Sequence, residues 1–431
     1  MEVLIIGAGA AGLAAAHDLA AAGVKTLIVE ARDRIGGRIW TVRAGESAAP
    51  VELGAEFVHG KPSNLLGIAA AAQLAVLPMS GRHEYRRGGR PVNGAELLGE
   101  VEPIFERLAD PAVPDQPFSE FLNHIEAAPD VRRLALNYVE GFNAARADRI
   151  STRSLAFESQ AQDAIGGDQA FRFEAGYDRL PQWLWSHCES GAELALNTVV
   201  ESISWRRGEV NVECRHSSRG SVSFSADRAV ITLPLGVLQL AGSDRGAIRF
   251  HPRPAVLDQA LDRLEMGDAA RVTFLFRESF WQNFQELSDA GFIHSDNDVF
   301  PTWWTTLSGA ARGLTAWAGG PKAEKVSDLA DDEIAAGAID SLASILGTPR
   351  EAITRCVENW YLHNWSQDPF ARGAYSYARV GGLEAREQLA QPVEATLYLA
   401  GEATDTEGHS ATVHGALASG QRAARQILAR G

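Results

Sequence analysis

The sequence is poor in cysteine, has no long apolar run and lacks an excess of basic residues. Its 3 cysteines, Cys188, Cys214 and Cys356, are scattered, without a CxxC pair or a metal-ligand spacing. This excludes a disulfide framework, predicts no metal site and favours a reducing compartment. The longest apolar stretch, residues 65–77, is too short to span a bilayer. The net charge of −15 argues against a nucleic-acid partner, because a phosphate-binding surface needs basic residues. The same charge suits a cationic substrate, although many proteins are acidic for solubility alone.

The length and the composition are those of an ordinary globular chain. Its 431 residues, 45% hydrophobic and 22% charged, allow two or three domains with sizeable cores. The first apolar run begins at Val3, which leaves no room for a secretory signal peptide, and the chain ends directly after a predicted helix. We therefore expect a cytoplasmic protein with no membrane partner. Its oligomeric state is not predicted.

The sequence does contain a complete βαβ unit at its start. Residues 3–6 form a continuous apolar run, typical of a buried parallel strand, and a second such run covers residues 24–29. Between them a G-x-G-x-x-G turn at residues 7–12 opens an Ala/Leu-rich helix, at whose N-terminus a pyrophosphate can approach the backbone. Glu30 ends the second strand, where a carboxylate can accept ribose hydroxyls. The unit predicts a dinucleotide site rather than a purely structural turn.

The segment after Glu30 distinguishes between dinucleotides. Residues 31–38 read Ala-Arg-Asp-Arg-Ile-Gly-Gly-Arg, so a second glycine pair and an arginine follow the acid. An arginine can hold a diphosphate through two hydrogen bonds; a solvated basic loop is the alternative. Here the chain resembles the flavin-dependent amine oxidase superfamily of monoamine oxidases, polyamine oxidases and lysine-specific histone demethylases. Its motifs are most similar to those of polyamine (spermine) oxidases. The resemblance implies FAD as the cofactor.

The C-terminal part of the chain carries the other half of the family's cofactor site. An apolar strand at residues 397–400 precedes Gly-Glu, and small residues at the start of a final helix, near 410–420, can pack against a flat ring. Matches at 196–200 (Leu-Asn-Thr-Val-Val) and 229–238 extend the resemblance, which runs in register from residue 3 to residue 424. The fingerprint and the resemblance together assign these residues to the cofactor: Gly7, Gly9, Ala11, Gly12, Glu30, Ala31, Arg32, Gly36, Gly37, Arg38, Leu53, Gly54, Ala55, Glu56, Val200, Thr232, Trp365, Gly401, Glu402, Thr412 and Val413.

The resemblance also places four residues near the substrate. Trp365 and Tyr375 stand at the family's W…G-x-Y-S positions, which implies that Tyr375 forms one wall of an aromatic cage for the amine; core packing is the alternative. Thr412 replaces the second cage tyrosine of monoamine oxidases, so the cage is half open. His59 follows Leu-Gly-Ala-Glu-Phe-Val and is expected to face the substrate nitrogen, where it can accept a proton near neutral pH; a structural histidine is the alternative.

Two positions depart from the family pattern. Ala374 stands where monoamine oxidases bond a cysteine to the flavin, so the FAD is expected to be noncovalent. Arg271 replaces a lysine that holds a water on flavin N5 and is linked to oxygen reactivity. Arginine keeps the charge but is planar and cannot act as a base, so the choice between oxidase and dehydrogenase stays open. A salt bridge to a nearby acid is the other interpretation of Arg271. Glu56 is expected to be structural or a charge at the pocket rim.

We expect an α/β fold: a Rossmann-like FAD-binding domain with an inserted α+β substrate domain. The FAD-binding domain is predicted to be discontinuous, with residues 1–75, 174–240 and 354–431, and the substrate-binding domain to comprise 76–173 and 241–353. Helices are expected around 117–146, 255–265 and 328–346, and strands near 193–203, 210–215, 222–224, 229–233, 270–277 and 314–318. Pocket walls are expected from 76–173 and 281–311, with Trp303, Trp304, Glu158 and Asp163 as candidates.

These features predict an FAD-dependent amine oxidase. A small-molecule amine, either a polyamine or another primary or secondary amine, would pass a hydride to flavin N5. The resulting imine would hydrolyse to an aldehyde or ketone, and O2, as electron acceptor, would give H2O2. Three alternatives stay open: an L-amino acid oxidase that uses Arg271 for the carboxylate, a desaturase or porphyrinogen-type oxidase on the same fold, and a non-catalytic flavoprotein that serves as an interaction module.

Overall fold

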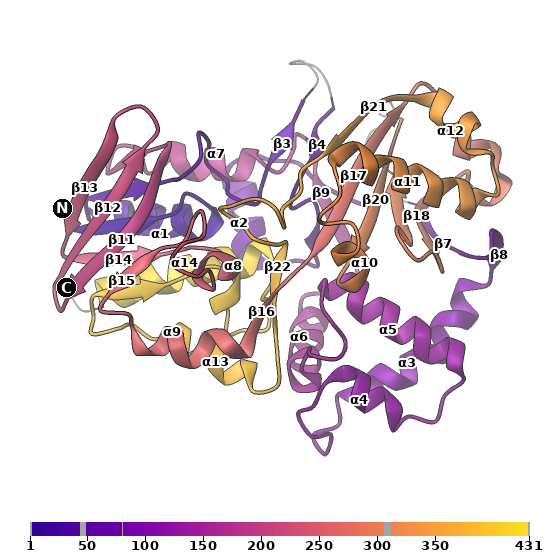
Figure 1. Ribbon diagram of the computed structural model, residues 1–431, viewed down its shortest axis with the longest axis horizontal. Coiled ribbons are helices and arrows are strands. Elements are labelled where there is room, and N and C mark those ends of the chain that lie inside the picture. The colour runs from indigo at the N-terminus through magenta and orange to yellow at the C-terminus, as the bar shows by residue number, and fades with distance from the viewer. Residues whose placement is uncertain (1, 44–48, 80, 306–311, 430–431) are drawn as a thin grey trace.

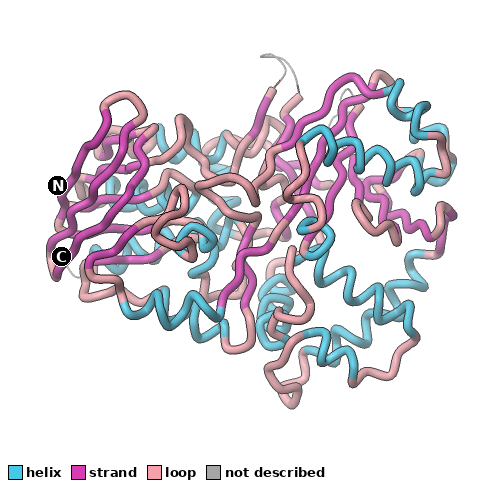
Figure 2. The backbone as a smooth tube through the Cα atoms, in the orientation of Figure 1, coloured by secondary structure: helices cyan, strands magenta, loops and turns pink. Residues whose placement is uncertain are grey.

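A computed structural model describes residues 2–43, 49–79, 81–305 and 312–429, and it shows two lobes side by side (Figure 1). Residues 306–311, at the end of one predicted pocket-wall segment, lie outside the described residues. Both termini lie in the lobe at the left of Figure 1, and the other lobe is built on a large sheet with helices beneath it. Figure 2 shows that strands form the body of both lobes. Among the described residues, no helix is long and apolar enough to cross a membrane.

A five-stranded parallel sheet forms the centre of the first lobe. Its order is β10-β2-β1-β14-β23, with bounds Ala192–Ala195, Thr26–Val29, Val3–Ile6, Arg228–Ile231 and Leu397–Leu399. Strands β1, β2 and β23 are buried along their whole length, which explains their continuous apolar runs. Three segments far apart in sequence therefore meet in one sheet. The predicted strands at 3–6 and 24–29 are confirmed.

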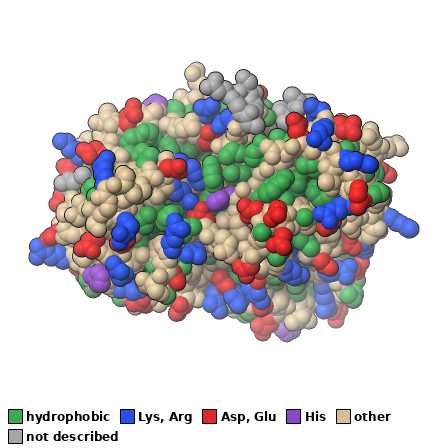
Figure 3. Space-filling model, turned by 45° about the horizontal axis from the view of Figure 1, so that its top comes forward, with side chains coloured by type: hydrophobic (Ala, Val, Ile, Leu, Met, Phe, Trp, Pro, Cys, Tyr) green, Lys and Arg blue, Asp and Glu red, His purple; other side chains and the backbone are tan. Residues whose placement is uncertain are grey.

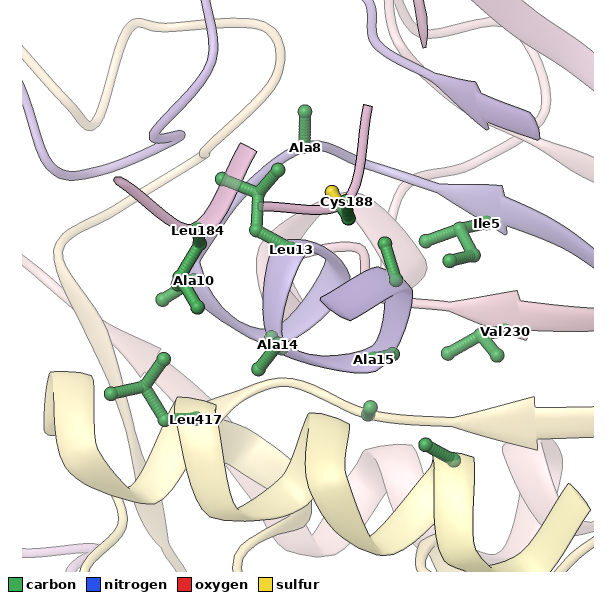
Figure 4. Close-up of a cluster of buried hydrophobic side chains, with 14 of the residues drawn as sticks. Ile5, Ala8, Ala10, Leu13, Ala14, Ala15, Leu184, Cys188, Val230 and Leu417 are labelled. Carbon is green, nitrogen blue, oxygen red and sulfur yellow. The ribbon is translucent and has the colours of Figure 1, made fainter. Parts of the chain in front are cut away.

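Helices α1 (Ala10–Ala21), α14 (Val413–Leu428) and α7 (Arg179–Ser186) cover one face of this sheet. Figure 4 shows the small side chains of α1 between the sheet and Leu417 of α14. The two long helices approach closely because α14 presents Gly420 to α1, where a Cβ would overlap the carbonyl oxygen of Ala11. This packing sets the start of both helices at the same end of the sheet.

A four-stranded sheet covers the opposite face. Its order is β13-β12-β11-β15, with bounds Gly220–Ala226, Glu209–His216, Thr198–Arg206 and Arg249–His251. The prediction of one strand over 193–203 is wrong: Asn197, with φ of +54°, breaks the chain, so β10 joins the parallel sheet and β11 the antiparallel one. Because Asn tolerates the left-handed region, this break needs no glycine.

A seven-stranded sheet forms the second lobe. Its order is β21-β17-β20-β19-β18-β7-β8, with bounds Val357–Leu362, Ala269–Phe276, Gly313–Gly319, Thr302–Thr305, Ala290–Ser295, Arg82–Arg87 and Arg90–Val92. One face packs on α11 (Asp331–Leu346) through a core that includes Val272, Phe274 and Trp303. The helices predicted around 117–146, 255–265 and 328–346 are confirmed as α4 (Phe118–Asn123), α5 (Pro129–Asn143), α9 (Ala255–Ala260) and α11.

The remaining elements connect and cover these sheets. They are β3 (Thr41–Val42), β4 (Val51–Glu52), β5 (Val58–His59), α2 (Ser63–Ala71), β6 (Val76–Pro78), α3 (Gly94–Leu108), α6 (Thr152–Ala164), β9 (Ala170–Phe173), α8 (Leu235–Leu238), η1 (Leu261–Arg263), β16 (Leu264–Gly267), η2 (Phe280–Asn283), η3 (Gln285–Leu287), α10 (Pro321–Glu324), α12 (Arg350–Cys356), β22 (Tyr375–Ala378), α13 (Gly382–Leu389) and η4 (Glu402–Thr404).

The strand pairings differ from the predicted domain boundaries at two places. Strand β15 lies beyond residue 240 yet pairs with β11 of the first lobe. Strand β21 lies beyond residue 354 yet pairs with β17 of the second lobe. Leu257, Leu261 and Leu264 also pack in the core of the first lobe. We therefore propose that the chain crosses between the lobes after Gly267 and after Leu362. Sequence periodicity marks each strand but carries no information about which sheet it joins.

Candidate cofactor and substrate site

The turn between β1 and α1 requires two of its glycines for packing. Gly7 has a φ of +105°, and a Cβ there would lie 2.6 Å from the hydroxyl of Thr232. That hydroxyl donates to the carbonyl of Ile6 at 2.8 Å, which ties the turn to the end of β14. A Cβ at Gly12 would overlap the carbonyl oxygen of Gly7. Both positions therefore accept only glycine.

Gly9 differs, because the space beside it is open. A Cβ at Gly9 would meet nothing within 4 Å, and no side chain caps the start of α1. The first N–H groups of a helix lack intrahelical partners and carry partial positive charge, so this end offers an open cradle for an anion. The residues at this turn fit a pyrophosphate.

Glu30 lies at the end of β2 and is buried. Its carboxylate accepts backbone hydrogen bonds from Ala8 at 2.8 Å and Arg32 at 2.9 Å. Burial raises the pKa of Glu30, and these two bonds partly offset that rise. A carboxylate has about four lone-pair sites, so each oxygen keeps capacity for a ribose hydroxyl. The backbone N–H of Thr198 donates to the carbonyl of Glu30 at 2.8 Å, which brings Val200 into the same region.

The second glycine pair lies directly on the first turn. The N–H of Gly36 donates to the carbonyl of Ala8 at 2.8 Å, and a Cβ at Gly37 would lie 3.3 Å from the Cα of Gly9. Arg38 then joins both halves of the predicted site, because its Nη1 donates to the carbonyl of Ala374 at 2.7 Å and to Glu402 at 3.0 Å. Residues far apart in the sequence are thus linked by one guanidinium.

The side chain of Arg32 pairs with Asp368, whereas that of Arg38 pairs with Glu402. The guanidinium of Arg32 forms two hydrogen bonds with Asp368, at 2.7 and 2.8 Å, and the ring of His363 lies 2.8 Å from the same carboxylate. Burial acts to raise the pKa of Asp368, but the hydrogen bonds from His363 and Arg32 outweigh it and hold that pKa below its usual range. The side chain of Arg32 therefore ties the loop before β22 to the end of β2.

Glu402 is buried beside the start of α14. It accepts from the hydroxyl of Ser376 at 2.6 Å and the backbone of Ala411 at 3.1 Å, besides Arg38. Burial acts to raise its pKa, and Arg38 and Ser376 outweigh that effect and lower it. Thr412 caps α14, because its hydroxyl accepts from the N–H of Gly415 at 3.0 Å. The hydroxyl of Thr412 is thus used for positioning the helix.

The turn at residues 53–55 is held by a tryptophan. The indole N–H of Trp365 donates to the carbonyl of Leu53 at 2.7 Å, and the ring is buried. A Cβ at Gly54 would overlap the carbonyl of Arg38 and lie 3.2 Å from the ring of Trp365. The N–H of Ala55 donates to the same Arg38 carbonyl at 3.1 Å. This turn is therefore fixed against the second glycine segment.

Arg271 is held by the residues that follow this turn. Its Nη1 donates to the carbonyl of Gly54 at 2.8 Å, and its Nη2 pairs with the carboxylate of Glu56. Glu56 also lies 2.7 Å from Nη2 of Arg172 and accepts from the indole of Trp304 at 3.1 Å. We call these four side chains (Glu56, Arg172, Arg271 and Trp304) the Glu56 cluster. Sequence analysis missed Arg172, for which no local signal exists.

His59 and Tyr375 are brought together by α5. The hydroxyl of Tyr375 donates to the carbonyl of Phe142 at 2.8 Å, and the rings of Phe142 and His59 lie 5.6 Å apart. Burial lowers the pKa of His59 to about 4 and raises that of Tyr375 above its usual range. Phe142 was not predicted, although it follows a helical run of apolar residues. Figure 3 shows hydrophobic side chains gathered across the middle of one face, with charged side chains around them.

The other predicted pocket residues separate into different environments. Trp303 is fully buried in the core under α11, whereas its neighbour Trp304 joins the Glu56 cluster on the opposite face of the sheet. Glu158 pairs with the buried Arg386 at 2.6 Å and supports the fold. Asp163 is exposed on α6. Among the described residues, no group of three or more His, Cys, Asp or Glu side chains could hold a metal ion.

The parallel sheet with the open helix start beside it, and a second lobe built on the seven-stranded sheet, define a two-domain α/β fold. A sequence model of the family described as flavin containing amine oxidoreductase matches residues 10–428, so the chain belongs to that family. The match confirms the resemblance predicted from the motifs.

Curated relatives match the whole chain. Lysine-specific histone demethylase 1 homolog 2 of Arabidopsis thaliana is 30% identical over 459 residues, which cover 99% of this chain and 58% of the relative. Polyamine oxidase 4 of Oryza sativa subsp. japonica is 28% identical over 462 residues, with 100% of this chain and 89% of the relative covered. The chain thus spans little more than half of the demethylase homologue.

Solved structures confirm the predicted α/β two-domain fold. A triple mutant of putrescine oxidase superposes with a TM-score of 0.83 at 21% identity, covering 100% of this chain and 99% of that one. Cyclohexylamine oxidase from Brevibacterium oxydans IH-35A gives 0.81 at 23% identity, with the same coverage. At these identities the likeness concerns the fold alone.

Proposed function

We propose that this protein is an FAD-dependent amine oxidase. It would oxidise an amine to an imine, which water hydrolyses to an aldehyde or ketone, with O2 as the electron acceptor and H2O2 as its product. The observation that carries the proposal is the position of Arg38. Through Gly36 and Gly37 it links the open start of α1 to Glu402 and to Ala374, directly before the strand that bears Tyr375. A dinucleotide held at the cradle therefore extends toward the pair His59 and Tyr375.

FAD fits the residues present. The cradle at Gly9 would hold the pyrophosphate, Glu30 the ribose, and the turn at 53–55 with the start of α14 the ring system. When bound, FAD supplies the hydride-accepting chemistry that no side chain provides. We propose noncovalent binding, because Ala374, directly before Tyr375, has no nucleophile.

His59 and Tyr375 would bind and orient the amine. With a pKa of about 4, His59 stays neutral at physiological pH. It is therefore suited to accepting a hydrogen bond from the amine rather than to holding its proton. Burial raises the pKa of Tyr375 and keeps it protonated, and its hydroxyl donates to the carbonyl of Phe142. The face of its ring therefore remains to contact the amine.

The Glu56 cluster argues against an L-amino acid oxidase. Such an enzyme needs a guanidinium that is free to bind the substrate carboxylate. Arg271 already pairs with Glu56 and donates to the carbonyl of Gly54, and it is only 8% exposed. A second carboxylate would have to displace Glu56 from its two arginines.

Anaerobic mixing of the FAD-loaded protein with a panel of monoamines, polyamines and L-amino acids tests the proposal. We expect amines to bleach the flavin absorbance and L-amino acids to leave it unchanged. Heat precipitation should release all the yellow colour into the supernatant. Absence of bleaching by every amine would refute the activity, and colour in the washed pellet would refute noncovalent attachment.

A further inference from the structure

One carboxylate of α6 connects three elements that are far apart in the sequence. Helix α6 packs with α3, α4 and α5 beneath the second lobe, where Leu155 joins their common core (Figure 1). Its Glu158 accepts, at a single oxygen, from Nη1 of Arg386 at 2.6 Å and from the hydroxyls of Ser154 and Ser410, at 2.9 and 2.8 Å. Arg386 lies on α13 and Ser410 in the loop before α14, and both helices pack in the cores of the first lobe. The carboxylate therefore joins the two lobes beside the start of α14.

The loop at residues 405–412, which we call the α14 loop, lies directly on α6. A Cβ at Gly408 would lie 2.5 Å from the Cβ of Ala161 and 3.2 Å from the carbonyl oxygen of Phe157. The φ of Gly408 is +83°, so the backbone there also favours glycine. Close packing at Gly408 and the hydrogen bond from Ser410 therefore both fix the loop against α6.

The α14 loop leads into the cap of α14. The hydroxyl of Thr412 donates to the carbonyl of His409 at 2.6 Å and accepts from the N–H of Gly415 at 3.0 Å. Ser410 lies between His409 and Thr412, and the next residue, Ala411, has a φ of +62°. Because this short segment is bonded at both ends, a displacement of Ser410 is passed on to the cap.

The start of α14 is the part of the proposed cofactor site that lies beside the flavin ring. Thr412 accepts the N–H groups of Gly415 and Ala416, at 3.0 and 3.1 Å. Val413 and His414 precede them in the first turn, where N–H groups lack partners within the helix and carry partial positive charge. Reduction adds negative charge to the bound ring, and positive charge beside the ring favours the reduced form. The position of this helix start therefore affects the reduction potential.

The two serines that donate to Glu158 have different surroundings. Ser154 lies one turn before Glu158 on the same helix, so its hydrogen bond stays within α6. The bond from Ser410 crosses between the lobes and ends in the α14 loop. The ion pair with Arg386, which is 2% exposed, supplies the counter-charge that a buried guanidinium needs. That pair does not require the bond to Ser410, so the two roles of Glu158 can be separated.

We propose that Glu158 is a positioning residue for the proposed amine oxidation. From α6 it holds Ser410, and through the α14 loop it sets where the start of α14 meets the flavin. The inference rests on the proposed function, and Glu158 itself contacts neither the flavin nor the amine in this role. Loss of the bond to Ser410 alters the reduction potential of the bound flavin, whereas loss of a purely structural bond alters only the stability.

Ser410→Ala and Ser154→Ala form a matched pair that tests the proposal. Each removes one neutral donor from the same oxygen at a buried position, 6% and 1% exposed, and neither changes a charge or the ion pair with Arg386. We expect similar losses of Tm in both. Ser410→Ala alone should reduce the preference for reduced over oxidised flavin about tenfold, which lowers the two-electron midpoint potential by about 30 mV. Anaerobic spectroelectrochemical titration of the FAD-loaded proteins measures it. No shift in Ser410→Ala, or an equal shift in Ser154→Ala, would overturn the proposal.

Glu158→Asp tests the same bond from the other lobe. It keeps the charge opposite Arg386 but shortens the side chain, which withdraws the carboxylate from Ser410. The midpoint potential should fall as in Ser410→Ala, and the double variant should show no further fall. A shift in Ser410→Ala that Glu158→Asp does not reproduce would show that Ser410 acts on the flavin directly and would overturn the role of Glu158. These titrations need no amine. Shifted potentials in a protein that oxidises no amine would refute the proposed function alone, and unshifted potentials in an active amine oxidase would refute the positioning role alone.

Discussion

Removal of the negative charge from the Glu56 cluster should destabilise the protein strongly. Glu56→Gln keeps the size of the side chain but leaves Arg172 and Arg271, 3% and 8% exposed, without the carboxylate that pairs with both of them. Breaking a buried ion pair by removing one partner costs about 3–5 kcal/mol. The expected loss lies toward the upper end of that range, because two like charges remain.

The size of the thermal shift follows from the length of the chain. At about 2.1 cal/mol/K per residue, 431 residues have an unfolding entropy of about 0.9 kcal/mol/K. The loss of about 3–5 kcal/mol in the free energy of unfolding then lowers Tm by about 3–6 °C if the two lobes unfold together. Differential scanning calorimetry at saturating FAD and equal flavin content measures it, because bound ligand itself raises Tm.

Two variants distinguish this explanation from a general effect of mutation. Adding Arg172→Gln to Glu56→Gln removes one of the two unpaired cations and should recover at least part of the loss. Glu384→Gln breaks an exposed pair with Arg153, whose side chains are 45% and 62% exposed, and should cost at most about 1 kcal/mol. The reasoning fails if Glu56→Gln costs no more than Glu384→Gln, or if the double variant is less stable than Glu56→Gln alone.

Three further predictions concern the cofactor and the reaction. Glu30→Gln should weaken FAD binding by about 1–3 kcal/mol, measured by fluorescence titration, because a charged acceptor for the ribose is lost; an unchanged affinity would mean that Glu30 only holds the backbone of Ala8 and Arg32. His59→Ala should slow flavin reduction about 10²-fold. Burial lowers the pKa of His59 to about 4, so the pH dependence of flavin reduction by His59→Ala between about pH 5.5 and 8 should have the same shape as that of the wild type. If the wild type shows an inflection in that range and the variant does not, His59 is not a neutral acceptor. Arg271→Lys should speed reoxidation by O2 in stopped-flow mixing, since a compact hydrated ammonium replaces the planar fork; no acceleration would identify Arg271 as an ion-pair partner of Glu56 alone.

His59 also affects stability with a defined sign. Its pKa is about 4 in the folded protein against an ordinary 6.5, so between these values the unfolded chain binds the proton and the folded protein does not. Its contribution therefore destabilises the folded state progressively as pH falls from about 6.5 to 4. The burial that keeps the imidazole neutral for the amine thus costs stability in acid.

Local sequence was sufficient wherever neighbouring residues determine the structure. The tight turn at Gly7, the contact of Gly12 with the carbonyl of Gly7 and the acid at the end of β2 lie within one βαβ unit. Such a unit is recognisable from spacing, because Gly12 meets the backbone of Gly7 and Glu30 bonds to the backbone of Ala8 within the same short segment. Apolar periodicity likewise predicted α1, α11 and the buried strands.

Contacts between distant elements were decided only by the tertiary structure. The break at Asn197 places consecutive strands in different sheets, and periodicity alone does not indicate it. The partners of Glu56 come from β9, β17 and β19, and a residue's face on a strand depends on register with its neighbours. Register separated Trp303, in the core, from Trp304, beside Glu56. Whether a charged or aromatic side chain is structural or faces a substrate thus depends on which strands pair, since the same alternating pattern fits either face of a sheet.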